Sequence, residues 1–276
     1  MKFSIFLSVM LVAGVSLAGA VESAATFGVL KVASTNVETV VSVPWVAAGT
    51  GESVKVKDFV KTANMTAGDA LYLYDASEQS YKEWVLVDGA WAGATTVKVT
   101  GIAAEAGEND TLDRGDALII WRQNYNSGDT PADSIYLYGQ YNSTGVTEYE
   151  MAYHTTAVKN TLFAPINTSG EVVYLNPKTA AEIDSGKTVV AAESWANVNK
   201  KDTIKVQDAT GYAVFLSWNN SESKWGVYNA FANEGAGGWT YDAAVIQPGM
   251  GAWYQAAKGT RNGAPKLTTT SVTGTK

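Results

Sequence analysis

The sequence predicts an all-β protein made of two tandem modules of the β-sandwich or jelly-roll type. Three observations lead to this prediction. Short runs of alternating apolar and polar residues recur along the chain, and clusters of Gly, Asn, Asp, Ser and Pro separate them. The sequence contains no long amphipathic helical pattern. A set of motifs also occurs twice in the same order, which indicates a duplicated unit.

The first twenty residues have the pattern of a secretory signal peptide. Lys2 gives a basic start, residues 3–17 form an apolar run, and Ala18 and Ala20 make an A-x-A-type cleavage site. The apolar run is shorter than the roughly 20 residues that a membrane-spanning helix needs. We therefore expect residues 1–20 to be removed. The mature chain is then secreted or held in a bacterial cell envelope, in the periplasm or at the outer surface.

The composition excludes several classes of function. The chain has no cysteine, so its stability must come from core burial, and cysteine nucleophiles and cysteine-type zinc sites are ruled out. The lack of cysteine in an exported chain also favours a bacterial source. The formal net charge is -7 with only three arginines, which disfavours nucleic acids and anionic membranes because phosphate binding needs concentrated positive charge. Nine tryptophans and fourteen tyrosines are the unusual feature.

The stretch 69–84, DALYLYDASEQSYKEW, has the pattern of a strand, a turn and a second strand. Alternation also marks the stretch 134–141, SIYLYGQY. Because side chains alternate across a strand, Leu71 and Leu73 of the first stretch and Ile135 and Leu137 of the second face the core, and the tyrosines that alternate with them face solvent. These tyrosines are Tyr72, Tyr74, Tyr136 and Tyr138. If the two strands share a sheet face, the four rings form a flat aromatic band that stacks on sugar rings or packs against another subunit.

Only short helical pieces are expected between the strands. One is the segment 57–62, KDFVKT. The other is NPKTAAEI, in which Asn176 caps the helix and Pro177 takes the first helical position.

The repeated motifs relate positions of the two halves. Alignment of Asp69 with Asp202 also aligns Leu71 with Ile204. The other paired motifs are VVSVPW at 40–45 with TLFAPI at 161–166, Trp91 with Trp225, and DRGDALIIW at 113–121 with QPGMGAWYQ at 247–255. From proline to aspartate the spacing is 25 residues in the first copy and 37 in the second, a difference that we assign to a surface loop. Four tryptophans at or near repeated positions are expected in the core, namely Trp84, Trp91, Trp218 and Trp225.

The repeat divides the chain into four parts. The signal peptide is followed by a first β-module at 21–145 and a second β-module at 146–260. Residues 261–276 are rich in threonine and are interpreted as a polar tail.

These motifs resemble those of a large group of uncharacterised exported bacterial proteins with β-rich modules. The group shares a VPW- or NPF-like turn, a GD-x-[IL]-x-[VL]-x-D strand, a tryptophan after the next hairpin, and a closing PG-x-G-[FW] turn. In this chain they are residues 43–45, 68–75, Trp91 and 248–253. Arg114 stands at the position of the motif proline in the first copy, and Lys201 replaces the glycine before Asp202. The resemblance implies secretion and β-rich modules, and it implies no activity, cofactor or catalytic residue.

No catalytic pattern stands out. His154 is the only histidine and no G-x-S-x-G elbow accompanies it, so we interpret it as an outward-facing strand residue. The carboxylates Asp75, Glu78 and Glu83 surround one turn, where such groups usually cap backbone amides and seldom hydrolyse glycosides. The acidic segment 108–116 has the oxygen-rich content that calcium favours but not the order of a dedicated calcium loop. We interpret it as a polar loop, with calcium binding left open.

These observations favour a non-enzymatic structural or adhesive protein of the bacterial surface or envelope, without a cofactor or a metal. Self-association or a surface glycan is then the expected partner. A first alternative is a carbohydrate-binding module protein whose ligand-binding residues are the four outward tyrosines, Tyr72, Tyr74, Tyr136 and Tyr138. A second alternative is an outer-membrane β-barrel, since alternation and aromatic residues occur there too.

Overall fold

The computed structural model describes residues 27–33, 38–43, 53–62, 65–94, 105–106, 109–113, 116–122, 134–140, 148–165, 172–208, 213–229 and 238–276. The expected signal peptide lies outside these residues. Strands dominate the described part of the chain, which confirms the all-β prediction. Its helical elements are short and include the α-helical turn α1 (Val56–Phe59) and the 3-10 turn η2 (Ala180–Glu182).

The strands divide between the two halves of the chain. In the first half they are β1 (Phe27–Ala33), β2 (Glu38–Ser42), β3 (Ser53–Lys55), β4 (Ala70–Asp75), β5 (Ser80–Val87), β6 (Ala90–Ala94), β7 (Glu105–Ala106), β8 (Thr111–Asp113), β9 (Ala117–Trp121) and β10 (Ser134–Gln140). In the second half they are β11 (Glu148–Glu150), β12 (Lys159–Phe163), β13 (Val173–Tyr174), β14 (Thr188–Ala196), β15 (Thr203–Gln207), β16 (Ala213–Asn219), β17 (Lys224–Asn229), β18 (Gly238–Thr240), β19 (Val245–Ile246), β20 (Ala252–Ala256) and β21 (Lys266–Thr273).

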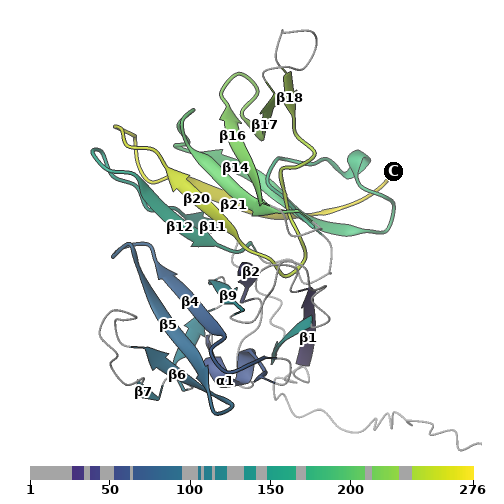
Figure 1. The fold of residues 1–276 in the computed structure, drawn as a ribbon. Helices are drawn as coiled ribbons and strands as arrows, with labels where there is room; N and C mark the ends of the chain where they lie inside the picture. The colour runs from purple at the N-terminus through teal and green to yellow at the C-terminus, as the bar shows by residue number, and fades with distance from the viewer. Residues whose placement is uncertain are drawn as a thin grey trace, which may run out of the picture.

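Each half contains a six-stranded antiparallel sheet with the same strand order. The first, which we call the N-sheet, runs β2-β9-β4-β5-β6-β7, and the second, the C-sheet, runs β12-β20-β15-β16-β17-β18. Figure 1 shows the C-sheet, teal to yellow, above the blue strands β4, β5 and β6 of the N-sheet. The order in which the chain visits the six positions is therefore the same in both halves.

The register of the central strands also agrees between the halves. Leu71 lies opposite Ile120 on one side and Trp84 on the other. Ile204 lies opposite Tyr254 and Leu216 on the corresponding strands. Both Leu71 and Ile204 are fully buried, as the alternation predicts. The shared strand order and register support the prediction of a duplicated module.

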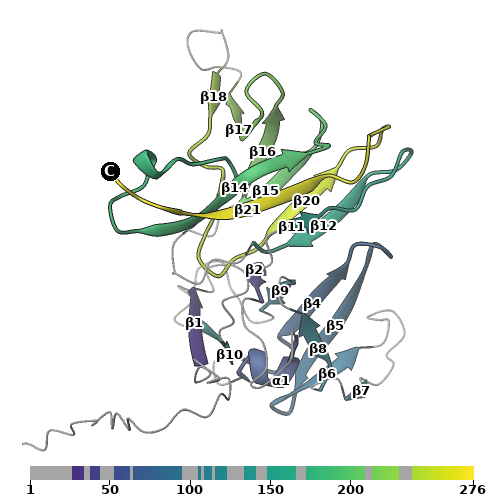
Figure 2. The ribbon, with the colours of Figure 1, turned by 180° about the vertical axis from the view of Figure 1, so that it is seen from behind.

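The second layers of the two halves differ. Among the described residues of the first half, the pairs β1–β10 and β3–β8 are separate two-stranded sheets, and Val60, at the end of α1, bridges to Leu137 of β10. In the second half the matching pairs β11–β21 and β13–β19 are joined by β14 into one five-stranded sheet. From behind, β21 and β14 lie in front of the C-sheet (Figure 2). The longer proline-to-aspartate spacing in the second half therefore contains a strand that joins two pairs, and not only a surface loop.

The tryptophans at or near the repeated positions lie in the core. All four expected core tryptophans are buried, namely Trp84, Trp91, Trp218 and Trp225. In the first half, Trp84 Nε1 donates to Asp110 Oδ2 at 2.8 Å and Trp91 Nε1 donates to the Val60 carbonyl at 3.1 Å. In the second half, the Trp195 ring of β14 packs edge-on to Trp225 with centroids 5.3 Å apart, which joins the two sheets of that half.

The two motif aspartates are buried hubs of hydrogen bonds. Asp69 is fully buried, accepts the Thr66 N–H at 2.9 Å and pairs with Arg122 at 2.9 Å. Asp202 is also fully buried and accepts the Asn199 N–H at 2.8 Å. In both halves, therefore, the donor is the backbone N–H three residues before the aspartate.

Asp202 has further partners. Arg261 donates to both of its oxygens, at 2.5 Å and 2.7 Å, and the Tyr254 hydroxyl donates at 2.5 Å. A bidentate Arg–carboxylate pair is among the strongest ion pairs in proteins. Two of the three arginines thus form ion pairs with these aspartates. The sequence does not predict these pairs, because the partners are 53 and 59 residues apart.

Two expectations about the second half need correction. Residues 261–276 are not a polar tail, because β21 lies between β11 and β14 with Leu267 fully buried. The threonines of this strand reflect β propensity. The segment beginning at Asn176 does not start a helix there. Asn176 instead bonds the backbone of Trp225, and the 3-10 turn begins later, with Thr179 and Glu182 forming a capping box.

The two halves pack through the outer faces of both six-stranded sheets. A small apolar cluster joins them, formed by Val40, Ala117, Ile119, Leu162 and Ala164, with Tyr72, Tyr74 and Trp253 packed against it. The turn before β20 covers the open edge of β2, since the Ser42 N–H donates to the Gly249 carbonyl and the Gly251 N–H to the Val40 carbonyl. This covered edge cannot pair with another strand.

Corresponding residues of the two halves meet at this contact. The register makes Ala117 correspond to Gly251 and Val40 to Leu162. A Cβ on Gly251 would lie 2.9 Å from the Cβ of Ala117, so glycine is required for the approach. Contact between equivalent positions is the arrangement of an isologous dimer interface.

Candidate binding groove

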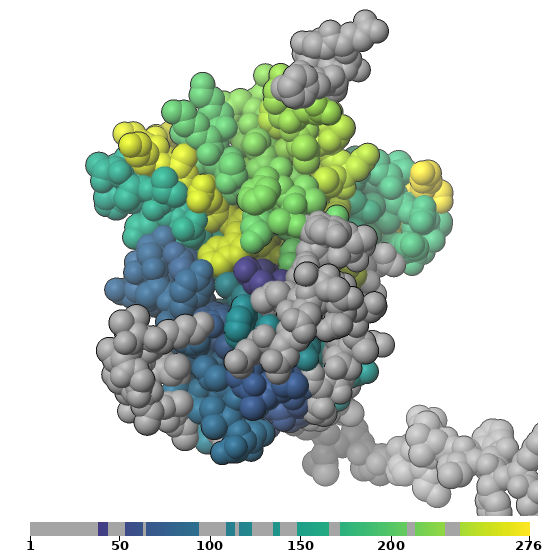
Figure 3. All heavy atoms as spheres, viewed as in Figure 1, coloured from purple at the N-terminus to yellow at the C-terminus, as the bar shows by residue number. Residues whose placement is uncertain are grey.

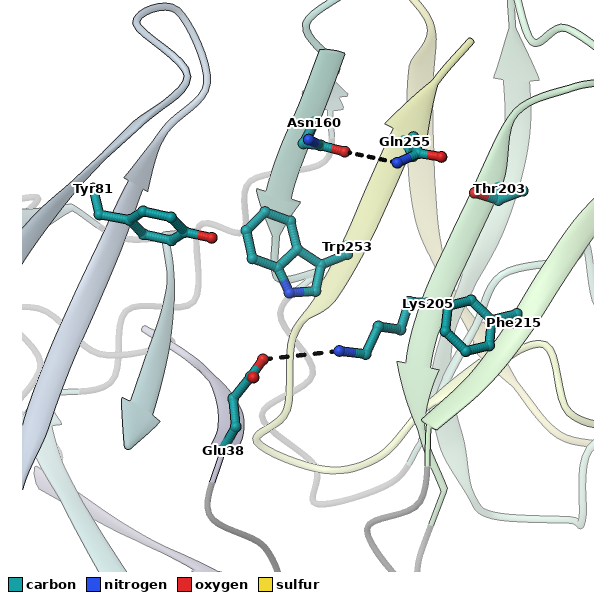
Figure 4. A pocket seen from close by; sticks show the side chains of 8 residues that line it. All are labelled: Glu38, Tyr81, Asn160, Thr203, Lys205, Phe215, Trp253 and Gln255. Carbon is teal, nitrogen blue, oxygen red and sulfur yellow. Dashed lines mark hydrogen bonds and ion pairs between the residues drawn. The ribbon is translucent and has the colours of Figure 1, made fainter. Parts of the chain in front are cut away.

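An open groove of about 550 Å³ lies where the two halves meet. Its lining residues come from β2, β5, β12, β15, β16 and β20, and they are Glu38, Tyr81, Asn160, Thr203, Lys205, Phe215, Trp253 and Gln255 (Figure 4). The outer face of the C-sheet forms the floor. Tyr81 of the first half forms the opposite wall, and its ring points toward Trp253.

Strand alternation explains why these side chains face the groove. Ile204 and Tyr254 are fully buried on the inner face of the C-sheet, so their neighbours along β15 and β20 point the other way. Across the strands, Lys205 lies opposite both Trp253 and Phe215. The floor is therefore an ordered row of side chains, with Lys205 between two aromatic rings.

Four aromatic residues of the two halves, which we call the aromatic wall, pack together: Tyr72, Tyr74, Tyr81 and Trp253. Trp253 packs edge-on to Tyr74 with ring centroids 5.0 Å apart and to Tyr81 at 6.4 Å. Tyr81 also contacts Tyr74 at 4.9 Å and Tyr72 at 5.9 Å. Burial raises the pKa of Tyr74 and of Tyr81 above the ordinary value, which is already above neutral pH. The cluster is a fixed apolar surface with phenol groups at its rim.

Two glutamines hold the walls of the groove together. Gln79 accepts the Asn160 N–H at 2.9 Å and donates to the Asn160 carbonyl at 3.0 Å. Gln207 accepts the Val40 N–H at 3.1 Å and donates to the Glu38 carbonyl at 3.1 Å. Each side-chain amide thus completes the backbone hydrogen bonds of the facing edge strand, as a neighbouring strand would. The groove is preorganised by these bonds.

The polar groups of the groove are mostly neutral. Gln255 Nε2 donates to Asn160 Oδ1 at 3.3 Å, and Thr203 adds a hydroxyl. The two charged lining residues, Lys205 and Glu38, face each other at 3.8 Å. Aromatic faces beside amides and hydroxyls fit a neutral, hydroxyl-rich ligand, because apolar ring faces stack while polar edges exchange hydrogen bonds.

The structure separates the four tyrosines that were expected to form one band. Tyr72 and Tyr74 lie on β4 of the N-sheet and belong to the aromatic wall. Tyr136 and Tyr138 lie on β10, which pairs with β1 in another sheet. The expected four-ring band is therefore not formed.

The aromatic residues that line the groove were not among the predicted site residues. They are Tyr81, Phe215 and Trp253. Alternation around Leu216 and Trp218 marks Phe215 as an outward residue, and it is 65% exposed. The alternation therefore identifies Phe215 as an outward residue from the sequence alone, but it does not predict which strands border the groove.

The other candidate groups have local structural roles. His154 is exposed as expected, but it does not lie on a strand. It lies in the link between β11 and β12, where its Nδ1 accepts the Thr156 N–H at 3.2 Å. Asp75 accepts the Ser77 hydroxyl at 2.6 Å and the N–H groups of Glu78 and Ser77 within its own turn, and these bonds hold its pKa below the ordinary value. Glu78 lies in this same turn, and Glu83 lies on β5 opposite Tyr72 of β4.

The acidic segment is described in part. Asp110 accepts from Trp84 and pairs with Lys82 at 3.2 Å. Within the described ranges, no group of three His, Cys, Asp or Glu residues has a geometry for holding a metal ion. Over the same residues, the structure contains no helix of the length and apolarity that a bilayer crossing requires.

Comparison of the chain with protein-family models, with curated proteins and with solved structures found no match.

Proposed function

We propose that the protein is an exported, non-enzymatic adhesive protein that binds carbohydrate in the groove between its halves. The observation that carries the proposal is the set of three aromatic side chains, Tyr81, Phe215 and Trp253, around a floor of amides and hydroxyls. Aromatic rings of this kind have an apolar face for a sugar ring and expose it at little entropic cost. Phe215 has no hydroxyl and is 65% exposed, which favours a ligand-contacting role over a structural one.

The remainder of the proposal concerns export and architecture. The basic and apolar start of the sequence supports export from a bacterial cell. The equal strand order of the N-sheet and C-sheet supports two tandem β-sandwich modules derived from one ancestor. In this proposal the duplication formed the groove, because the groove lies between the copies. An adhesive protein of this kind needs a ligand site and no catalytic group.

A glycan array tests the proposal. We expect the purified mature chain to bind a subset of neutral glycans, and Trp253→Ala and Phe215→Ala to lower the affinity at least roughly tenfold each. Tyr138→Ala is the matched control, because it removes an aromatic ring from β10, outside the groove, and should leave binding unchanged. Phe215→Ala is the sharper variant, since an exposed ring can be removed without opening the core.

Two results would refute the carbohydrate proposal. One is that a broad array gives no signal with the folded protein. The other is that binding is equally strong in Phe215→Ala, Trp253→Ala and the parent chain, with unchanged thermal melting curves.

A further inference from the structure

The outer face of the C-sheet continues beyond the groove with more aromatic rings. Ser217 of β16 lies opposite Gly226 of β17, and by alternation Phe215 and Tyr228 share their face. Tyr228 is 53% exposed and lies opposite Trp239 of β18. Figure 3 shows this face of the molecule, with the green atoms of β15 to β17 in one surface above the first half. The aromatic face therefore extends from β20 to β18.

The rings at the far end are held in a fixed arrangement. Tyr228 and Trp239 have ring centroids 5.3 Å apart, and the rings of Trp239 and Tyr241 are parallel within 3° at 6.4 Å. Asn219 Nδ2 donates to the Tyr241 hydroxyl at 2.8 Å, and Lys224 Nζ lies 5.4 Å from the centre of that ring. The rings are thus preorganised before any ligand arrives.

A glycine makes room for the last ring. A Cβ on Gly226 would lie 2.7 Å from Cδ1 of Tyr241, so the two atoms would clash unless one of them moved. The Tyr241 ring therefore rests on the strand where Gly226 presents only backbone. This is a specific reason for glycine inside a strand, where it is otherwise unfavourable.

A row of side-chain amides and hydroxyls, which ends at a glycine, runs beside these rings. In order across the strands, the row is Asn160, Gln255, Thr203, Ser217 and Gly226. From β20 to β18 the face spans four strand spacings, which is about 19 Å at about 4.8 Å per spacing. The lysines on this face already face carboxylates, Lys205 with Glu38 at 3.8 Å and Lys224 with Glu222 at 4.0 Å. The described part of the face is therefore long and aromatic, and its two lysines are paired with carboxylates.

We propose that the ligand is a long, unbranched, neutral glycan that extends from the groove across the C-sheet to Tyr228 and Trp239. This inference rests on the proposed function and names its ligand class. A glycan of several sugars is required because a single ring cannot span the face. The Tyr81 wall on one side of the groove disfavours branches, and the paired charges disfavour acidic sugars.

Chain length is the variable that tests the inference. Isothermal titration with disaccharides and hexasaccharides of cellulose, xylan, mannan and chitin should give at least one series in which the hexasaccharide binds at least about tenfold more tightly. Tyr228→Ala and Trp239→Ala should each remove most of that gain and leave disaccharide binding unchanged. Trp253→Ala should weaken both lengths, and Tyr138→Ala neither. Tyr228→Ser serves as a second variant, because its exposed position tolerates a polar residue.

The outcomes separate the two proposals. Equal affinity for both lengths, or a hexasaccharide gain that survives Tyr228→Ser and Trp239→Ala in folded protein, overturns the extended site but leaves the groove proposal standing. No binding of any length by the parent chain removes both.

Discussion

The two halves of this protein share an inner framework and differ on the outer faces of their sheets. At corresponding positions, Tyr72 of the first half is matched by Lys205 of the second, and Tyr74 by Gln207. The tyrosines pack against the other half, whereas Lys205 faces the open groove. If the halves arose by duplication, as we propose, the buried side has kept its apolar character, while the outer side has acquired an internal contact in one half and a groove in the other.

The halves also differ in how they hold the motif aspartate. Arg122 is 12% exposed beside Asp69, whereas Arg261 is 2% exposed beside Asp202 and binds both oxygens. The second half adds the Tyr254 hydroxyl at the position that Ile120 occupies in the first. The same backbone turn therefore supports a more deeply buried polar network in the second half.

Substitution of Asp69 and of Asp202 should cause the largest losses of stability. The two losses show which half depends more on its buried aspartate. Asp202→Asn leaves the buried Arg261 charge without its partner, and we expect a loss of about 3–5 kcal/mol in the free energy of unfolding. Asp69→Asn should cost less, because Arg122 reaches solvent. Urea denaturation measures both values. Asp58→Asn, which alters an exposed pair with Lys61, is the control and should cost under about 1 kcal/mol. Equal losses for Asp58→Asn and Asp202→Asn would contradict the buried network.

The Tyr254 hydroxyl gives a smaller and pH-dependent effect. Tyr254→Phe removes a hydrogen bond to a charged group and should cost about 1.5–3 kcal/mol at pH 7. Burial raises the pKa of Tyr254 well above its ordinary value of 10.0. The hydroxyl therefore contributes its full share of stability at pH values below the pKa of tyrosine in the unfolded chain. That share is lost as the pH rises above this pKa.

Unfolding of the parent chain and of Tyr254→Phe, followed from pH 8 to pH 11, measures this difference. The gap in stability between them should narrow on the alkaline side. A constant gap across that range would mean that the hydroxyl does not titrate differently in the folded and unfolded chains.

The contact between the halves can be tested by exchanging the residues at two corresponding positions. Gly251→Ala forces a methyl group against Ala117 and should cost about 1–3 kcal/mol by overpacking. The double variant Gly251→Ala with Ala117→Gly returns the lost space and should recover part of the loss. Thermal melting of both variants provides the measurement. Additive losses would show that the two residues do not meet.

Local rules were sufficient for the strands and insufficient for the site. The inward positions of Leu71 and Ile204 follow from period-two alternation, which depends only on neighbouring residues. The separation of Tyr136 from Tyr72 depends on which strands pair, and alternation carries no information about pairing. The partners of Asp69 and Asp202 lie far along the chain, and a strand rich in threonine resembles a polar tail when its neighbours are unknown. For the same reason the groove, which lies between the two halves, was not predicted.

Backbone amide NMR during titration with an array-positive oligosaccharide tests the central claim most directly, because it reports on both halves at once. We expect the largest shifts on β15, β16 and β20, around Lys205, Phe215 and Trp253. Shifts centred on Tyr136 and Tyr138 of β10, or spread equally over both sheets, would contradict it.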